Sequence, residues 1–219
     1  MDLPSLLALA WPVMLQGTAY TLLFAVASMV FALPLSGAIT LVRVLRIPVA
    51  QRLVALYVSA MRGTPLLVQV FIVYYGLPSI GIEFSPITAG ILALTLNVAA
   101  YLSETLRGSI HAVSQGQWSA GTSLGLTRTQ TLRYIIGPQA LRAAVPSLSN
   151  SLISLIKDTS LVSVIAVTEL MLATKELIST TFQPFPLYLA AAGIYWAMSA
   201  SFEKLQSKLE VRLNRSYLR

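Results

Sequence analysis

The chain has 219 residues, of which 56% are hydrophobic and only 11% are charged. Soluble globular domains carry about 25% charged residues, so the composition excludes an ordinary soluble domain, and its apolar character excludes intrinsic disorder. Cysteine is absent and His111 is the single histidine. This excludes disulfides, iron–sulfur clusters and Cys-ligated zinc, and no metal or cofactor is expected in this chain.

Segments without Asp, Glu, Lys or Arg predict the membrane-spanning helices. The longest, Leu3–Val42, has 40 residues, and Leu177–Phe202 has 26. Because a bilayer core about 30 Å thick needs about 20 mostly apolar residues per helix, we predict an all-α membrane protein with a single domain over 1–219. Its five transmembrane helices are predicted at about 14–42, 52–77, 86–109, 141–168 and 184–203.

The placement of the basic residues predicts how these helices are oriented. Twelve of the fifteen Lys and Arg residues lie in the connection between the first two spans, in the connection between the third and fourth, and in the tail from Lys204 to Arg219. Cytoplasmic loops are enriched in Lys and Arg, so the N-terminus is expected outside and the C-terminus in the cytoplasm. The net charge of +7 then reflects topology and anionic lipid headgroups, and no nucleic-acid partner is expected.

The connection between the third and fourth spans has the pattern of a helical hairpin. Ser119–Leu124 predicts a short helix that Gly125 ends, since glycine adopts the left-handed turn at a helix C-terminus. Thr127 or Thr129 can cap a second helix, and Gly137-Pro138 predicts a break before the fourth span. Such a hairpin on the cytoplasmic face is a docking element for a soluble partner, or else a loop that only packs on its own bundle.

Four motifs follow one another along the chain: RGTPLLVQ at 62–69, LNVAAYLSETLRG at 96–108, GQWSAGTSLGL at 116–126 and KDTSL at 157–161. The third motif resembles the EAA loop of ABC importer permeases. The other three resemble the signatures of the second, third and fourth spans in the polar amino-acid uptake family, of the histidine, glutamine and arginine permease type. The resemblance covers nearly the whole chain, which is identified as a member of that family.

The resemblance implies that the chain is the transmembrane permease subunit of an ATP-driven ABC importer for polar amino acids, in the bacterial cytoplasmic (inner) membrane. The implied partners are a cytoplasmic ABC ATPase dimer, a second permease copy or a sister permease, an extracytoplasmic amino-acid-binding protein, and membrane lipid. ATP and Mg²⁺ then belong to the partner ATPase, because no lysine of this chain follows a glycine and the P-loop motif G-x-x-x-x-G-K-[ST] is absent. The chain alone is therefore expected not to be an enzyme, and to form the translocation path by alternating access.

In that family the EAA loop is the coupling helix that sits in a groove of the ATPase. The resemblance assigns this role to a coupling loop at about 114–138. Ser119 stands where the family has glutamate, which removes a charge, and Gly121 stands where it has a second alanine, which keeps the side chain small. The predicted coupling residues are Gly116, Ser119, Ala120, Gly121 and Gly125.

Polar residues inside the third and fourth spans form the candidate substrate site, because charges within a membrane are costly and functional by default. Glu104 shares one helical face with Asn97 and Tyr101. The carboxylates of Glu104 and Asp158 can meet the ammonium group of an amino acid, which favours a cationic or zwitterionic substrate, and amide and hydroxyl groups can bind its carboxylate. The predicted substrate-binding residues are Asn97, Tyr101, Glu104, Asp158, Thr159 and Ser160.

Structural roles stay open for the charged members of this set. Glu104 can form an i,i+3 helix pair with Arg107, and Lys157 and Asp158 can form a buried structural pair. The chain would then be a scaffold permease that binds no substrate within a heteromeric complex. Whether Glu104 and Asp158 face the central cavity distinguishes the two hypotheses.

Three residues before the apolar part of the second span, Arg62, Thr64 and Pro65, predict either a helix cap or a gate at the cytoplasmic mouth of the path. Import of a related amine or opine-like solute is an alternative that the motifs leave open. A simple channel is a weaker hypothesis, because it has no use for a docking hairpin.

Overall fold

The computed structural model describes residues 2–214, and every regular element in that range is a helix, which confirms the all-α prediction for this part of the chain. Arg215 and Arg219 of the predicted basic tail lie outside it. The α-helices are α1 (Leu3–Val44), α2 (Ala50–Gly63), α3 (Leu66–Phe71), α4 (Pro86–Ala112), α5 (Gln115–Ser123), α6 (Arg128–Thr131), α7 (Gly137–Asp158), α8 (Leu170–Thr181) and α9 (Pro184–Asn214). Shorter π-helical segments are Ile72–Gly76 and Leu132–Ile136, and 3₁₀ segments are Leu77–Ile80 and Thr159–Ile165.

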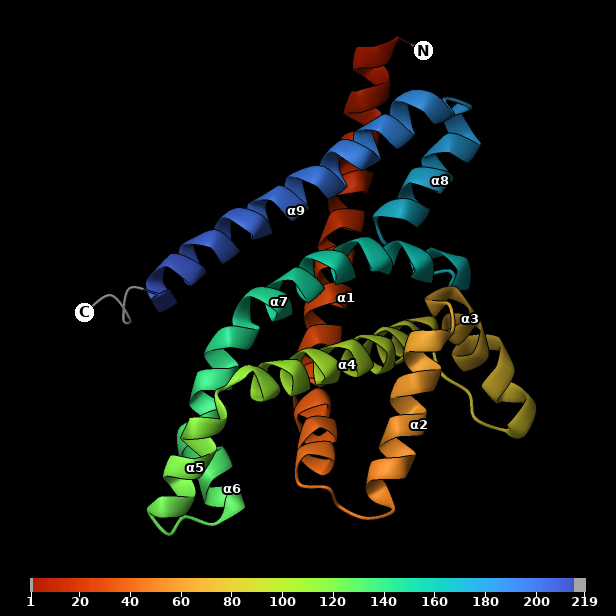
Figure 1. The fold of residues 1–219 in the computed structure, drawn as a ribbon. Helices are drawn as coiled ribbons and strands as arrows, with labels where there is room; N and C mark the ends of the chain where they lie inside the picture. Colours follow the sequence, from red (N-terminus) through yellow and green to blue (C-terminus); the bar gives the residue numbers. More distant parts are fainter. Residues whose placement is uncertain (1, 215–219) are drawn as a thin grey trace.

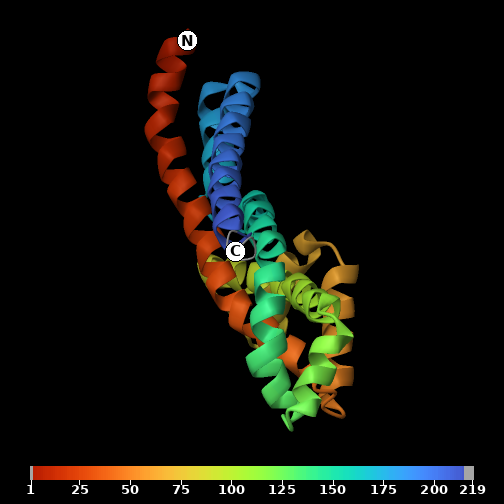
Figure 2. The same cartoon turned by 60° about the vertical axis from the view of Figure 1, so that its left-hand side comes forward.

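Helix α1 runs through most of the height of the molecule (Figure 1). It has 42 residues, which is about 63 Å at 1.5 Å per residue. Pro12 and Pro34 lie inside it, each removes one backbone hydrogen bond, and the helix curves along its length (Figure 2). Its N-terminal half lies beside α8 and α9 and its C-terminal half beside α4 and α2, so α1 connects the two ends of the fold (Figure 1).

The interface between α1 and α4 forms the largest part of the core, and small side chains keep it tight. Ala25 and Ala32 of α1 and Ala89 of α4 are fully buried. A Cβ atom on Gly90 of α4 would lie only 2.9 Å from the ring of Phe24 on α1. Close approach of backbones through small residues is how helices associate in a membrane, where lipid weakens the hydrophobic driving force between them.

A buried carboxylate joins the upper helices of the fold. Glu169 is 0% exposed and caps α8 by accepting a hydrogen bond from the Leu172 amide at 3.0 Å. It also accepts the Tyr195 hydroxyl of α9 at 2.7 Å and the Thr21 hydroxyl of α1 at 3.4 Å. These contacts hold α8, a helix that lies outside the five predicted spans, between α1 and α9.

The second predicted span is strongly bent. The chain bends by 111° between helix α2 and the helical segment Leu66–Ile80, because Pro65 forces extended backbone on the residue before it. That residue, Thr64, has φ −119° and ψ 148°. By length and composition, two helices, Pro4–Val44 and Pro86–Ala112, could each cross a membrane, and the bent pair could count as a third. The number of five spans stays a prediction.

The predicted break at Gly137-Pro138 is wrong, because the chain is helical from Arg128 to Asp158. A π-helical turn at Leu132–Ile136 leads directly into α7, and the proline lies in the first turn of α7, where its missing N–H is tolerated. A Cβ atom on Gly137 would lie 2.7 Å from the Leu132 carbonyl oxygen, so this turn requires glycine. The hairpin of α5 and α6 is therefore continuous with α7.

Gly17 offers a test of the close helix packing. A Cβ atom there would lie 2.9 Å from the Cα atom of Leu170, whereas a Cβ atom on Gly37 of the same helix would have no neighbour within 4 Å. We predict that Gly17→Ala lowers the free energy of unfolding by about 1–3 kcal/mol, and that Gly37→Ala is neutral or stabilising because alanine favours helix. Thermal unfolding of the detergent-purified variants measures both effects, and equal stability of the two variants would contradict the packing argument.

Candidate functional site

A polar cavity of about 640 Å³ lies where the break between α2 and α3 meets α4 and α7. Three of the six predicted substrate-binding residues line it, namely Asn97, Tyr101 and Asp158. Two of the three predicted gating residues, Thr64 and Pro65, line it as well. The structure thus brings together residues from three separate sequence motifs.

Other residues in the wall of this cavity were not among the predicted site residues. Lys157, Asn150 and Ser154 line it from α7, and Glu203 lines it from α9. On α7 the lining residues recur every three or four positions, which places them on one helical face. That periodicity was a signal available in the sequence, whereas nothing local indicates that Glu203 reaches the same cavity.

The remaining predicted substrate-binding residues do not line the cavity. Thr159 is buried, and its hydroxyl donates to the Ile156 carbonyl oxygen at 2.8 Å. The Ser160 hydroxyl donates to the Lys157 carbonyl oxygen at 2.7 Å. Both hydroxyls serve the 3₁₀ turns that continue α7, and Glu104 belongs to a different cluster.

Asn97 holds the break between α2 and α3 in place. Its side-chain NH₂ donates to Oε1 of Gln69 at 2.9 Å and to the Met61 carbonyl oxygen at 3.3 Å. The buried Gln69 amide donates in turn to the Thr64 hydroxyl oxygen at 2.9 Å and to the same Met61 oxygen at 2.9 Å. These bonds satisfy carbonyl oxygens that the end of α2 leaves without helical partners.

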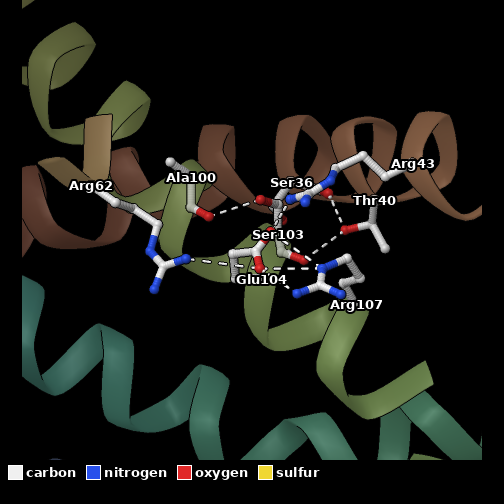
Figure 3. A network of polar contacts seen from close by, with 8 residues as sticks. All are labelled: Ser36, Thr40, Arg43, Arg62, Ala100, Ser103, Glu104 and Arg107. Atoms are coloured by element: carbon white, nitrogen blue, oxygen red, sulfur yellow. Dashed lines mark hydrogen bonds and ion pairs between the residues drawn. The ribbon is translucent and has the colours of Figure 1, made fainter. Parts of the chain in front are cut away.

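Glu104 of α4 lies among three arginines from three helices (Figure 3). Arg43 of α1 pairs with one carboxylate oxygen, and Nη2 of Arg107 donates to the other at 2.7 Å. Arg62 of α2 lies 3.8 Å away. The Glu104 side chain is 17% exposed, and the i,i+3 pair with Arg107 that the sequence left open is present.

This cluster, Arg43, Arg62, Glu104 and Arg107, has an excess of two positive charges. Such a cluster repels an ammonium group, so Glu104 is poorly placed to meet the amine of a substrate. The cluster is nevertheless linked to the polar cavity, because the Arg62 guanidinium carbon lies 5.4 Å from the ring centroid of Tyr101. The geometry therefore suits Glu104 to hold the three arginines in position rather than to bind a substrate directly.

Helices α5 and α6 form the predicted hairpin, and the sequence signals for its turn are confirmed. Gly125 adopts the left-handed conformation with φ 73°. The Leu126 amide donates to the Gly121 carbonyl oxygen at 3.1 Å and the Gly125 amide to that of Thr122 at 2.9 Å, which is the Schellman pattern. Thr127 caps α6 with its side chain.

The five predicted coupling residues divide into an outer and an inner group. Gly116, Ser119 and Ala120 are exposed on α5, and Gly125 is exposed in the turn that follows it. Gly121 is buried, and a Cβ atom there would lie 2.5 Å from the methyl carbon of Thr131 on α6. The small residue thus allows the two helices of the hairpin to touch, while the exposed residues form its outer surface.

Residues 2–214 offer neither a metal site nor a hydrolase nucleophile. No group of three or more His, Cys, Asp or Glu side chains in that range could hold a metal ion. The spacing G-x-S-x-G occurs at 121–125, but its Ser123 ends helix α5, whereas a nucleophile elbow follows a strand.

The fold matches solved membrane transporters. A chain in the crystal structure of an amino acid ABC transporter with histidines has a TM-score of 0.91 and 34% identity, with 97% of this chain and 99% of that chain covered. A chain of the MetNI methionine ABC transporter in an inward-facing conformation has a TM-score of 0.78 and 16% identity, with the same coverage, and this second likeness concerns the fold alone. The fold is that of the membrane subunit of an ABC transport system.

Sequence comparison assigns the family. The family of the binding-protein-dependent transport system inner membrane component matches residues 32–215. The chain is 41% identical to the L-cystine transport system permease protein TcyB of Bacillus subtilis (strain 168), over 94% of this chain and 88% of that protein. It is 40% identical to the probable amino-acid ABC transporter permease protein PatM of Vibrio harveyi, over 95% of each chain. This chain belongs to the family of binding-protein-dependent transport system inner membrane components.

The arginine cluster predicts a stability effect with a specific rescue. Glu104→Gln removes the carboxylate that three guanidinium groups share, so it should lower the free energy of unfolding by about 2 kcal/mol. Adding Arg62→Gln should restore part of this loss, because one of the three repelling charges is then absent. Unfolding of detergent-purified chains measures both variants, with Glu83→Gln, an exposed carboxylate, as control. A double variant less stable than Glu104→Gln would contradict the repulsion argument.

Proposed function

We propose that this chain forms the translocation path of an ATP-driven amino-acid importer, and that the cavity bounded by Asn97, Tyr101 and Asp158 is its substrate site. The cavity contains both signs of charge beside neutral amide groups, and this is the observation on which the proposal depends. Relatives at about 40% identity are named as amino-acid permeases, which supports amino acids as the substrate class.

The lining residues match the two charged ends of an amino acid. The carboxylates of Asp158 and Glu203 can accept hydrogen bonds from an ammonium group, and the Lys157 ammonium can donate to a carboxylate. Charge-assisted hydrogen bonds of this kind are the stronger ones. The charged lining favours substrate contact over a scaffold that binds nothing, and it favours zwitterionic or cationic amino acids and related amines over acidic ones.

Within this proposal the other predicted residues support the path. Glu104 holds Arg43, Arg62 and Arg107 together at one end of α4. Arg62, through its contact with Tyr101, couples that cluster to the cavity and acts as a gate with the proline break beside it. Thr159 and Ser160 shape the turn after Asp158 rather than bind substrate.

The complex that we propose has five spans in this chain, with the N-terminus outside and the C-terminus in the cytoplasm. A second permease, an ATPase dimer that holds ATP and Mg²⁺, and an extracytoplasmic binding protein complete it. The hairpin docks on the ATPase, and its continuity with α7 offers a direct mechanical path from ATP to the cavity, since Asp158 ends that helix. ATP-driven closure of the ATPase then moves α7 and alternates access.

The cavity carboxylate is the first test of the substrate site. Asp158→Asn should reduce uptake in proteoliposomes containing the assembled complex by about 10–100-fold, because one charge-assisted hydrogen bond is lost. The matched control is Glu176→Gln, which changes an exposed carboxylate on α8 outside the cavity and should transport normally.

Assembly must be measured beside transport, by co-purification of the ATPase with each variant. Normal uptake by Asp158→Asn in an intact complex would refute the substrate site. Loss of uptake in both variants would point to a general defect and would also contradict the assignment of this cavity.

The hairpin provides a test of coupling. Gly121→Val should force α5 away from α6, because even a Cβ atom would overlap Thr131, and stimulation of ATP hydrolysis by substrate should fall about tenfold. Gly193→Val on α9 should leave stimulation unchanged, since a Cβ atom there would have no neighbour within 4 Å and the residue lies outside the hairpin. The measurement is the rate of ATP hydrolysis by reconstituted complexes of each variant, with and without substrate-loaded binding protein. Full stimulation in Gly121→Val would count against the coupling role.

A further inference from the structure

A second polar cavity, of about 760 Å³, lies behind the hairpin and shares no lining residue with the candidate substrate site. Three parts of the fold form its wall: the end of α1 with the turn that follows, the end of α4, and the hairpin. Each part contributes basic side chains, which are Arg43, Arg46, Arg107, His111 and Arg128. No carboxylate is among the described residues of this wall.

The positive charge of this basic cavity is only partly balanced. One carboxylate, that of Glu104, lies outside the wall and serves both Arg43 and Arg107. Within residues 2–214, neither Arg46 nor Arg128 forms an ion pair. The cavity therefore keeps an excess of positive charge that an anion would balance.

Arg128 is held in position although it has no carboxylate partner. Its Nη2 atom donates to the Val44 carbonyl oxygen at 3.3 Å, which joins the hairpin to the end of α1. Its guanidinium carbon also lies 5.8 Å from the ring centroid of Trp118. A guanidinium group fixed in this way, with donors left over, is suited to bind the oxygens of a phosphate.

An apolar cavity of about 720 Å³ adjoins the basic one. Ile110 lines both cavities, and Val44 and Thr131 of the basic wall are followed in the chain by Leu45 and Leu132 of the apolar wall. A free phosphate would use only the basic cavity. A phospholipid, which joins a phosphate to hydrocarbon, would use both.

We propose that these two cavities bind one anionic phospholipid of the cytoplasmic leaflet. Its phosphate group lies between Arg46 and Arg128, and an acyl chain packs against Leu45 and Leu132. The proposal rests on the cytoplasmic placement of the hairpin in the proposed function, because basic pockets between helices at that face suit anionic headgroups. A bound lipid would bridge the turn after α1 to the hairpin and so affect how firmly the hairpin is held.

Trp118 lines the basic cavity and can report binding directly. The other two tryptophans, Trp11 and Trp196, are 55% and 74% exposed and can be replaced by Phe. The full-length chain in detergent is then titrated with phosphatidylglycerol or phosphatidylcholine carrying brominated acyl chains, which quench nearby tryptophan. We expect half-maximal quenching at an at least fivefold lower concentration of the anionic lipid, a preference that salt reduces. The titration needs neither ATP nor substrate, so its result can be interpreted even if the transport proposal fails.

Matched arginine variants decide where the lipid binds. Arg46→Gln should weaken the preference for phosphatidylglycerol about fivefold, the effect of one basic residue near a membrane surface. Arg52→Gln removes another exposed arginine, which lies outside the cavity, and should have no effect. Arg128→Gln is a second variant. Because Arg128 lies against Trp118, its removal also changes the fluorescence of Trp118 itself, so this variant is evaluated from the ratio of the half-maximal concentrations of the two lipids.

Competition identifies the source of the phosphate. If inorganic phosphate relieves the quenching, and Arg46→Gln weakens this competition as it weakens lipid binding, the phosphate site is supported and free phosphate is a second ligand. Equal quenching by both lipids, or equal loss in Arg46→Gln and Arg52→Gln, would overturn the proposal. Displacement of the lipid by the partner ATPase without nucleotide would also overturn it, because an acidic protein surface would then be the occupant.

Discussion

A carboxylate or amide side chain inside a bilayer has no water to bond with, so it needs a partner within the protein. This constraint explains how the helices of this chain are placed. Glu169 is satisfied only where α1, α8 and α9 meet. Glu104 is satisfied only where α1, α2 and α4 meet. The Gln69–Asn97 pair requires that the break after α2 faces α4. Polar contacts thus select one arrangement from the many that apolar helices could adopt in lipid.

Glycine and other small residues allow the close helix packing that this arrangement of polar contacts requires. Gly17 and Gly90 let α1 approach α8 and α4, which brings the polar partners within reach of one another. In the middle of the chain, Gly121 lets α5 contact α6 and Gly137 lets the hairpin continue into α7. The exposed hairpin, helix α7 and the polar cavity consequently form one connected unit.

Local signals allowed much of this architecture to be predicted from the sequence. Uncharged segments indicate helices in lipid, and the left-handed Gly125 and the capping Thr127 act over a few residues, so the hairpin turn was predicted correctly. The break at Gly137-Pro138 was predicted wrongly, because a π-helical turn accommodates the proline. Of the partners of Glu104, the sequence indicated only Arg107, three residues away. Arg43 could not be predicted, since it lies 61 residues away in the chain and nothing local links the two. The buried contacts of Glu169 and the position of Glu203 in the cavity could not be predicted for the same reason.

The break between α2 and α3 differs from the arginine cluster in the kind of group that holds it. Its bonds join the amides of Gln69 and Asn97 to backbone carbonyl and hydroxyl oxygens, and none of these groups carries a net charge. Moving one elementary charge across a membrane potential of 100 mV changes the energy by about 2.3 kcal/mol, whereas moving neutral amides changes it little. Exchange of these hydrogen bonds is therefore electrically silent in itself, and any effect of membrane voltage at this break would act through the charge of Arg62, which lies two residues before Thr64.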